Sequence, residues 1–322
     1  MSCAETIDVT EVLTRLYKAE NILLLCHKNP DGDTIGSSAA LYHALKRLGK
    51  TVAVLCADPI PPRYDYMQIG LFDGSFEPAY VVAVDVAGIQ LFGDAVREYS
   101  ERTDLCIDHH PSNTGYADAI LLDGSAAATA ELMYDVLCAM NAEIDPLVAE
   151  CLYTGVATDT GCFKFANTTA RTHAVAAKLI EAGADVARLN SILFENKSRS
   201  RLAVEQLALE NLEYHFDGRC ALTHLTKEEI AATGAEPDDL EGVTGIPRAN
   251  EGVEVGVTLR QQPTGSYKIS VRTVLGKDAS AIAAHLGGGG HKQAAGCELL
   301  GSLENAKSAV LAEVERELCR ES

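Results

Sequence analysis

Aspartate and histidine residues gather in four short segments of the first half of the chain, and their carboxylates and imidazoles are side chains that bind divalent metal ions. A site with several carboxylates and two or three imidazoles carries a high negative charge, which two divalent ions offset better than one. Two neighbouring ions are suited to in-line displacement at phosphorus. The candidate residues are His27, Asp31 and Asp33 in the first segment, Asp85 in the second, Asp108, His109 and His110 in the third, and Asp159 in the fourth.

The segments follow short apolar runs, several of which are apolar on both parities, as in strands buried on both faces. Helical patterns between the runs, over 37–48 and from a cap at Ser125 through Met140, predict an α/β fold with a doubly wound, mainly parallel sheet. In such a sheet, ligands bind at the carboxyl ends of the strands, so all four segments are expected at one edge. The predicted strands are 22–26, 52–56, 80–84, 105–107 and 119–122.

The ligand types also predict which ions bind. Oxygen-rich sites with some imidazole suit Mn²⁺ better than Zn²⁺ or Ca²⁺, so we expect two Mn²⁺ ions, with Mg²⁺ as the alternative. Asp85 stands alone at a strand end between the other ligand segments, and we expect it to bridge the two ions.

Each segment also has a simpler interpretation when it is taken singly. Asp31 and Asp33 are common turn residues, Asp85 suits a helix cap, and His109 with His110 suits a polar loop. Chance placement of all four segments at strand ends is the less favoured explanation.

The pattern changes around the polar, charged stretch 195–201, which predicts a boundary between two domains. We expect a catalytic domain at 1–185, a linker at 186–201 and a smaller α/β substrate domain at 202–322. The second domain is predicted to open with a helix at 202–214 and to contain strands at 220–224, 252–260 and 267–272. Alternation in the last two strands predicts a hairpin whose polar face carries Arg260, Lys268 and Arg272.

Four consecutive glycines precede a histidine in this second domain. Gly287, Gly288, Gly289 and Gly290 allow backbone N–H groups to turn inward around an anion, with His291 as a further donor. A flexible loop is the alternative, but the guanidinium of Arg272 on the polar hairpin face favours binding of a phosphate.

The motifs Asp108-His109-His110 and His27-x-Asn-Pro-Asp31-x-Asp33-x-x-Gly36-Ser37 resemble the DHH phosphoesterase superfamily. The resemblance implies that His27 and Asp31 hold one metal ion, and that Asp33, His109 and Asp159 hold the other. It further implies that Asp85 bridges the ions, that Asp108 orients its neighbours, and that His110 faces the substrate phosphate or the leaving group. Thr34 stands where the family often has alanine.

The glycine motif and Ser270-Val-Arg272 resemble the DHH-associated substrate domain, and 246–248 with 252–256 resemble the bacterial nanoRNases within the superfamily. This resemblance implies hydrolysis of di- to pentaribonucleotides to mononucleotides and removal of the 3′-phosphate of adenosine 3′,5′-bisphosphate (pAp). Three enzymatic alternatives share the metal core: a RecJ-like single-strand exonuclease, a linear or cyclic dinucleotide phosphodiesterase, and a polyphosphate or pyrophosphate hydrolase. A nucleotide-sensing binding protein is the non-enzymatic alternative.

Composition excludes other partners. The net charge of −19 argues against wrapping of long duplex DNA, which needs a broad basic surface. No apolar run approaches the ~20 residues of a membrane span. The ten cysteines form no CxxC pair and suit a reducing compartment, so we expect a cytoplasmic protein. A homodimer is open beside a monomer.

Overall fold

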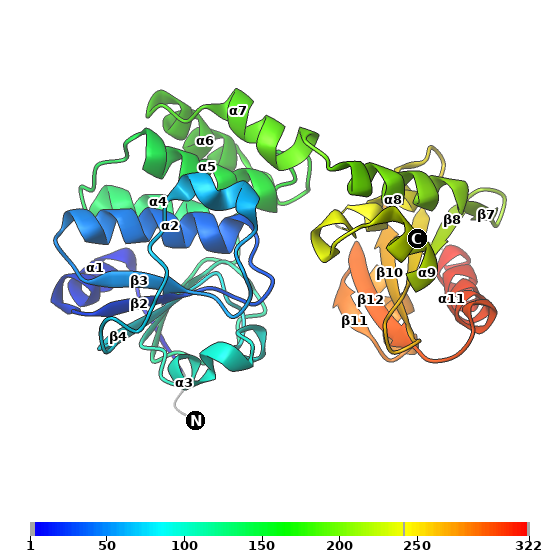
Figure 1. The fold of residues 1–322 in the computed structure, drawn as a ribbon, viewed down its shortest axis with the longest axis horizontal. Coiled ribbons are helices and arrows are strands. Elements are labelled where there is room, and N and C mark those ends of the chain that lie inside the picture. Colours follow the sequence, from blue (N-terminus) through cyan, green and yellow to red (C-terminus); the bar gives the residue numbers. More distant parts are fainter. Residues whose placement is uncertain (1–3, 241, 321–322) are drawn as a thin grey trace. The chain divides into compact units, whose positions relative to one another are not determined.

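The computed structural model describes residues 4–240 and 242–320, which divide into two compact units at Asn196 and Lys197 (Figure 1). The division lies where the sequence changes pattern, although the domain and linker limits given above stay a prediction. The stretch expected as a linker contains α7 (Val186–Asn190), a π-helical turn at Ser191–Glu195 and the start of α8 (Arg199–Glu210).

The first unit is built on a six-stranded sheet in which every pair of neighbours is parallel, in the order β1-β6-β5-β4-β2-β3. The predicted α/β class and all five predicted strands are confirmed, and a short edge strand, β1, is added. The strands are β1 (Glu5–Thr6), β2 (Ile22–Leu25), β3 (Val52–Leu55), β4 (Tyr80–Val84), β5 (Leu105–Asp108) and β6 (Ala119–Leu122).

Alternate side chains of these strands enter two separate apolar cores, which explains why the strands are apolar on both parities. Ile22 and Leu24 pack into the larger core, whereas Leu23 and Leu25 pack into the smaller one. Figure 1 shows α2, α4 and α5 on one side of the sheet and the short α3 on the other. The helices of this unit are α1 (Val9–Lys18), α2 (Gly32–Arg47), α3 (Arg97–Ser100), α4 (Thr129–Ala139), α5 (Pro146–Asp159), α6 (Ala170–Glu181) and α7.

Two local expectations in this unit are wrong. Ser125 does not cap a helix: α4 begins at Thr129 after Ala128, and the Ser125 hydroxyl donates instead to Asp123 in the preceding turn. Asp159 does not follow a strand, because it is the last residue of α5, which begins at Pro146 behind the capping side chain of Asp145.

The second unit contains a six-stranded mixed sheet in the order β11-β12-β10-β9-β8-β7, in which only β8 and β9 are parallel neighbours. The predicted hairpin is present as β9 and β10, with Gln261 paired with Tyr267 across the turn. The strands are β7 (Glu213–His215), β8 (Cys220–Leu225), β9 (Val255–Gln261), β10 (Tyr267–Thr273), β11 (Gly289–His291) and β12 (Ala294–Leu299).

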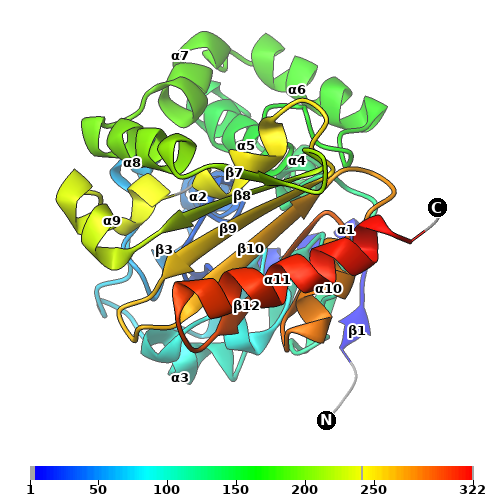
Figure 2. The ribbon, with the colours of Figure 1, turned by 90° about the vertical axis from the view of Figure 1, so that its right-hand side faces the viewer.

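Helices α10 (Ala279–His285) and α11 (Leu303–Leu318) cover one face of this sheet, and Figure 2 shows α11 lying across it. On the other face, α8 and α9 (Lys227–Thr233) form a small core with Leu225 of β8. The helix expected at 202–214 therefore starts three residues earlier and ends at Glu210, before β7.

Nine cysteines lie in the described part of the chain, and all nine are free. Within residues 4–240 and 242–320, no helix combines the length and the apolar character that crossing a membrane requires.

Candidate metal centre

Three neighbouring strands, β2, β4 and β5, bring the first candidate ligands to one edge of the sheet. His27 follows β2, Asp85 follows β4, and His109 follows β5. The chain leaves β2 toward β3 on one side and returns to β4 on the other, so the edge between β2 and β4 is a topological switch point. Ligands bind at such points in open α/β sheets.

The two acids of the first segment lie at the start of α2. Asp31 is the N-cap, and its Oδ1 accepts hydrogen bonds from the backbone N–H groups of Asp33 (3.0 Å) and Thr34 (3.2 Å). The cap fixes the direction in which Asp31 presents its carboxylate. Asp31 is thus a helix-capping residue and a candidate metal ligand at the same time, so the two interpretations of this segment do not exclude each other.

The predicted ligands converge in three groups whose donor atoms lie within 4.8 Å of one another. His27 Nε2 is 3.6 Å from Asp31 Oδ1 and 3.9 Å from Asp85 Oδ2. Donor atoms bound to one ion at about 2.0–2.2 Å lie about 3–3.6 Å apart, so these spacings are close to those of a coordination shell. The groups are His27–Asp31–Asp85, Asp33–His109–Asp159 and Asp85–His109–His110.

Asp85 belongs to two of the groups, as does His109, so Asp85 lies between the group that contains His27 and the group that contains His110. Its side chain is 2 % exposed, and its Oδ1 lies 3.7 Å from Nε2 of His109 while its Oδ2 faces His27. The backbone of Asp85 has φ +62°, a conformation that is costly for a residue with a side chain and that concentrates at functional sites.

The N-terminus of α4 holds two of the carboxylates. The backbone N–H groups of Thr129 and Ala130 donate to Oδ2 (2.6 Å) and Oδ1 (2.9 Å) of Asp33, and the Thr129 hydroxyl donates to Asp85 Oδ1 (2.8 Å). A helix N-terminus stabilises negative charge. The sequence interpretation missed Thr129, because its partners lie 96 and 44 positions away and no local pattern marks such contacts.

Burial raises the pKa of Asp33 and of Asp85 well above the usual range of an aspartate, and neighbouring charges add to this effect. For Asp33 the neighbours are Asp85 and Asp159, and for Asp85 they are Asp31 and Asp159. The cluster is therefore a site in which carboxylates need a positive partner.

The buried His109 and the partly buried His27 show where such a partner fits. His109 Nδ1 donates to the Ala126 carbonyl (3.1 Å), which leaves Nε2 directed at the acids, 3.2 Å from Asp159 Oδ2 and 3.7 Å from Asp85 Oδ1. In His27, Nδ1 donates to the Lys28 carbonyl (2.9 Å) and Nε2 faces the acids. Histidine ligands in metal sites are commonly oriented in this way through their second nitrogen.

Burial alone would lower the pKa of both histidines, but the acids around them reverse the effect. Asp31 and Asp85 raise the pKa of His27 to about 10, and Asp159, Asp33 and Asp85 raise that of His109 to about 10. Protons on these rings stand where divalent cations would bind, and a cation would displace them. The donor set therefore fits hard or borderline divalent metal ions.

Asp108 belongs to none of the three ligand groups but contacts two of their residues. Its Oδ1 accepts from the backbone N–H of His109 (2.8 Å) and from Nδ1 of His110 (2.7 Å), and its Oδ2 accepts from Asn113 Nδ2 (2.6 Å). Burial alone would raise the pKa of Asp108, but the hydrogen bonds from His110 and Asn113 outweigh it. The pKa of Asp108 therefore lies below the usual value of an aspartate. The carboxylate thus orients the His109–His110 pair, and Asn113 is a further contributor that sequence patterns did not indicate.

The residues predicted to bind substrate lie in the second unit. Arg272 on β10 is partly buried and directs Nη2 toward the Thr244 hydroxyl (3.4 Å), and no described carboxylate forms an ion pair with it. The glycines have a packing role that the sequence interpretation did not include. A Cβ at Gly288 would lie 2.2 Å from the Gly296 carbonyl, and one at Gly290 would lie 2.6 Å from the Ala294 carbonyl. Gly289 and His291 are exposed on β11.

Comparison with known proteins identifies the family of this chain. The family model "DHH family, N-terminal domain" matches residues 21–156, and the "DHHA1 domain" model matches residues 224–318. A Thermus thermophilus protein named "Bifunctional oligoribonuclease and PAP phosphatase NrnA" is 37 % identical over 317 residues, which cover 93 % of this chain and 90 % of that protein.

Among solved structures, an exopolyphosphatase-related protein from Bacteroides fragilis superposes with a TM-score of 0.87 at 28 % identity, covering 96 % of this chain and 95 % of that one. The exonuclease RecJ bound to manganese has a TM-score of 0.54 at 15 % identity, covering 100 % of this chain and 97 % of that one, and it shares the fold. The chain therefore belongs to the DHH family of phosphoesterases, with a C-terminal DHHA1 domain.

Proposed function

We propose that this protein is a metal-dependent phosphoesterase that degrades short oligoribonucleotides to mononucleotides and removes the 3′-phosphate of pAp. The observation that carries the proposal is the convergence of three ligand groups, two of which contain Asp85. The substrate class is supported by the Thermus protein, whose name describes both activities and whose similarity extends over 93 % of this chain.

In this proposal, His27 and Asp31 hold one divalent ion, Asp33, His109 and Asp159 hold the second, and Asp85 bridges them. The ions would be Mn²⁺ or Mg²⁺, and when bound they would supply Lewis acidity and lower the pKa of a bound water molecule. Manganese is the ion bound in the RecJ structure, which has the same fold.

Side chains and backbone N–H groups of the protein are proposed to position the substrate and to offset the negative charge of its phosphates. Asp108 accepts a hydrogen bond from Nδ1–H of His110, which leaves Nε2 of this partly exposed ring free to face the substrate phosphate or the leaving group. Arg272, the backbone of 287–290 and His291 are proposed to hold a phosphate in the second unit. The partly buried guanidinium of Arg272 has no described acidic partner, which favours an external anion.

Several further expectations belong to the proposal. The net charge of −19 supports short substrates over long duplex DNA. Free thiols throughout the described residues support a cytoplasmic location. All metal-ligand positions are occupied by ligating residue types, which favours an enzyme over a nucleotide-sensing binding protein. A homodimer stays a prediction.

The test compares hydrolysis of pAp, a labelled diribonucleotide, a long single-stranded RNA and polyphosphate by the purified protein with Mn²⁺. We expect pAp and the dinucleotide to be consumed fastest. Asp85→Asn keeps the side-chain shape and should reduce hydrolysis by at least ~10²-fold. Asp94→Asn is the matched control, because the Asp94 side chain is 99 % exposed.

An active Asp85→Asn variant would contradict the shared-ligand centre. Fastest consumption of polyphosphate or of long RNA would leave the metal centre in place and overturn the substrate class.

A further inference from the structure

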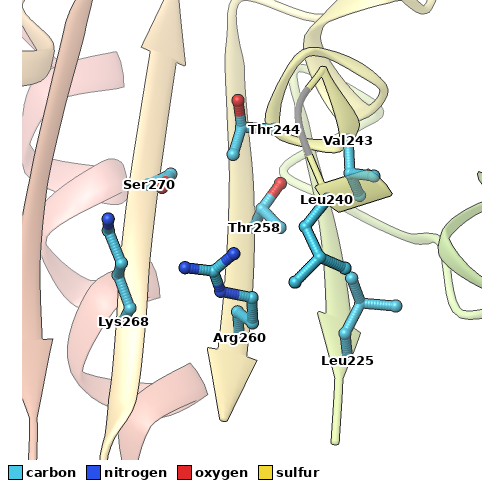
Figure 3. Close-up of a pocket in the computed structure, with 8 residues that line it drawn as sticks. All are labelled: Leu225, Leu240, Val243, Thr244, Thr258, Arg260, Lys268 and Ser270. Carbon is cyan, nitrogen blue, oxygen red and sulfur yellow. The ribbon is translucent and has the colours of Figure 1, made fainter. Parts of the chain in front are cut away.

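One exposed aromatic ring beside the metal centre has no role in the function proposed above. The pocket over β8, β9 and β10 in Figure 3 is not a separate candidate, because Arg272 directs Nη2 to Thr244 in its wall and the pocket thus adjoins the residues proposed to hold a phosphate. In the first unit, residues 160–169 form a loop that follows Asp159, the last residue of α5. The exposed ring belongs to Phe165 in this loop.

Phe165 differs from the other phenylalanines in its exposure. It is 57 % exposed, whereas the other six phenylalanines of the chain are buried or partly buried. Phe163, two residues earlier, stacks on the ring of His173 at a centroid distance of 5.1 Å, so the loop directs one ring inward and the other outward. Single exposed apolar side chains are common on protein surfaces. Exposure by itself therefore assigns no role, and the way in which the ring is held decides.

The backbone of the loop is bent sharply and fixed. Gly161, Cys162 and Phe163 have φ values of +56°, +58° and +63°, so three consecutive residues are left-handed and two of them carry side chains. Such conformations cost free energy and concentrate at ligand-binding and catalytic sites. The backbone N–H of Phe165 donates to the Thr160 carbonyl (3.0 Å), which closes the turn. The position of the ring thus depends on a backbone that does not relax to an ordinary loop.

Gly161 packs against one face of the Phe165 ring. A Cβ at Gly161 would lie 2.4 Å from Cζ of the ring and 2.6 and 2.7 Å from its two Cε atoms. A position in the plane of the ring beyond Cζ would be clearly farther from the Cε atoms than from Cζ, so these similar distances place Gly161 over the face. The opposite face is left for a ligand, and only a glycine permits this packing.

Hydrogen bonds connect the loop to the elements that hold the metal ligands. Asn167 Nδ2 donates to the carbonyl of Asp159 (3.1 Å) and to that of Ala127 (3.0 Å), which lies shortly before the N-terminus of α4. Asp159 Oδ2 in turn lies 3.2 Å from Nε2 of His109. The Phe165 ring is therefore fixed at the edge of the metal centre, over a glycine two residues from a predicted ligand.

A nucleobase is the ligand that this arrangement favours. When the phosphate of a nucleotide lies at the metal centre, the ribose places the base beside the centre. Bases stack on aromatic side chains with little dependence on sequence, because every base has a flat π face. Lys164, the neighbour of Phe165, is also exposed and brings positive charge to this edge, which suits a nucleotide better than an apolar peptide.

We propose that Phe165 is a stacking platform for the base of the nucleotide whose phosphate lies at the metal centre. The proposal rests on the proposed function and deepens it, because it assigns a base-binding residue to the first unit. It also gives the protein a means of distinguishing nucleotides from phosphate compounds that contain no base, while accepting purines and pyrimidines alike.

The test compares the unmodified protein with Phe165→Ala and Phe165→Trp on two 5′-labelled substrates, a diribonucleotide and its analogue with both bases replaced by hydrogen. We expect Phe165→Ala to raise KM for the diribonucleotide by about 5–150-fold, the range for loss of one stacked base, and to change kcat much less. Phe165→Trp keeps an aromatic face and should retain a low KM. On the analogue without bases, the unmodified protein and Phe165→Ala should have the same KM.

The matched control is Ile180→Ala, which truncates a half-exposed apolar side chain in the last turn of α6. An equal rise of KM in this control would overturn the proposal, as would an unchanged KM in Phe165→Ala or an equal rise on the analogue without bases. Thermal melting of the variants checks that they are folded.

A second copy of the chain is the competing occupant of the exposed ring. If Phe165→Ala changes the sedimentation coefficient of the protein and leaves KM for the diribonucleotide unchanged, the ring contacts another copy and the proposal is wrong. Failure of the proposed function would appear differently, as absence of diribonucleotide and pAp hydrolysis by the unmodified protein.

Discussion

Thr129 offers a sharp test of how the first unit positions its carboxylates. The side chain is fully buried, and its hydroxyl donates a 2.8 Å hydrogen bond to Asp85 Oδ1, while its backbone N–H donates to Asp33. Thr129→Val preserves the shape and the backbone bond and removes only the hydroxyl donor. A hydrogen bond to a charged group contributes about 1.5–3 kcal/mol, which corresponds to roughly 10–100-fold in an equilibrium constant.

We therefore expect Thr129→Val to weaken Mn²⁺ binding, measured by isothermal titration, by about 10–100-fold, the range found for groups that orient metal ligands. Hydrolysis of pAp at limiting Mn²⁺ should fall in parallel and recover in part at high Mn²⁺. Thr129→Ser keeps the hydroxyl and should restore both quantities. Unchanged Mn²⁺ affinity in Thr129→Val, or an equal loss in Thr129→Ser, would refute the assignment of Thr129 as a positioning residue.

Two further predictions concern stability. A Cβ at Gly36 would lie 2.3 Å from the Cys151 carbonyl of α5, so Gly36→Ala should lower the free energy of unfolding, measured in urea, by about 1–3 kcal/mol. Gly245→Ala is the control, because a Cβ at Gly245 would lie in open space. Equal effects of the two substitutions would contradict the packing argument. His27 and His109 have pKa values of about 10 in the folded protein, against 6.5 for a free histidine. Protonation of these rings therefore stabilises the metal-free protein fully below about pH 6.5, and this stabilisation is lost as the pH rises toward 10. Melting temperatures with a chelator should therefore fall from pH 7 to 9, and saturating Mn²⁺ should suppress the fall; a flat metal-free profile would count against this linkage.

The parallel sheet could be predicted because its strands carry a strong local signal. Runs such as 22–25 and 80–84 are apolar on both parities since alternate side chains enter two different cores. Once these strands were placed, the ends of β2, β4 and β5 also placed His27, Asp85 and His109 near one another.

The remaining site residues depend on helix ends and long-range contacts that leave no periodic pattern. Asp159 terminates a 14-residue helix whose last turn contains small and β-branched residues, a composition that also suits a strand end. Thr129 and Asn113 act through hydrogen bonds to carboxylates, and neither residue type is distinctive in sequence. The glycines at 288 and 290 were interpreted as an anion nest, but close backbone approach of β11 to β12 also requires them.

The arrangement of helix ends explains how so many acids can be buried together. Asp31 accepts from the N-terminus of α2 and Asp33 from the N-terminus of α4, so backbone dipoles offset part of their charge. The rest is left to the protons on His27 and His109, whose pKa values the neighbouring acids raise to about 10. Divalent cations would replace these protons at the same atoms. Metal binding is then an exchange within a folded site, which requires that the helices hold the carboxylates in place before any ion arrives.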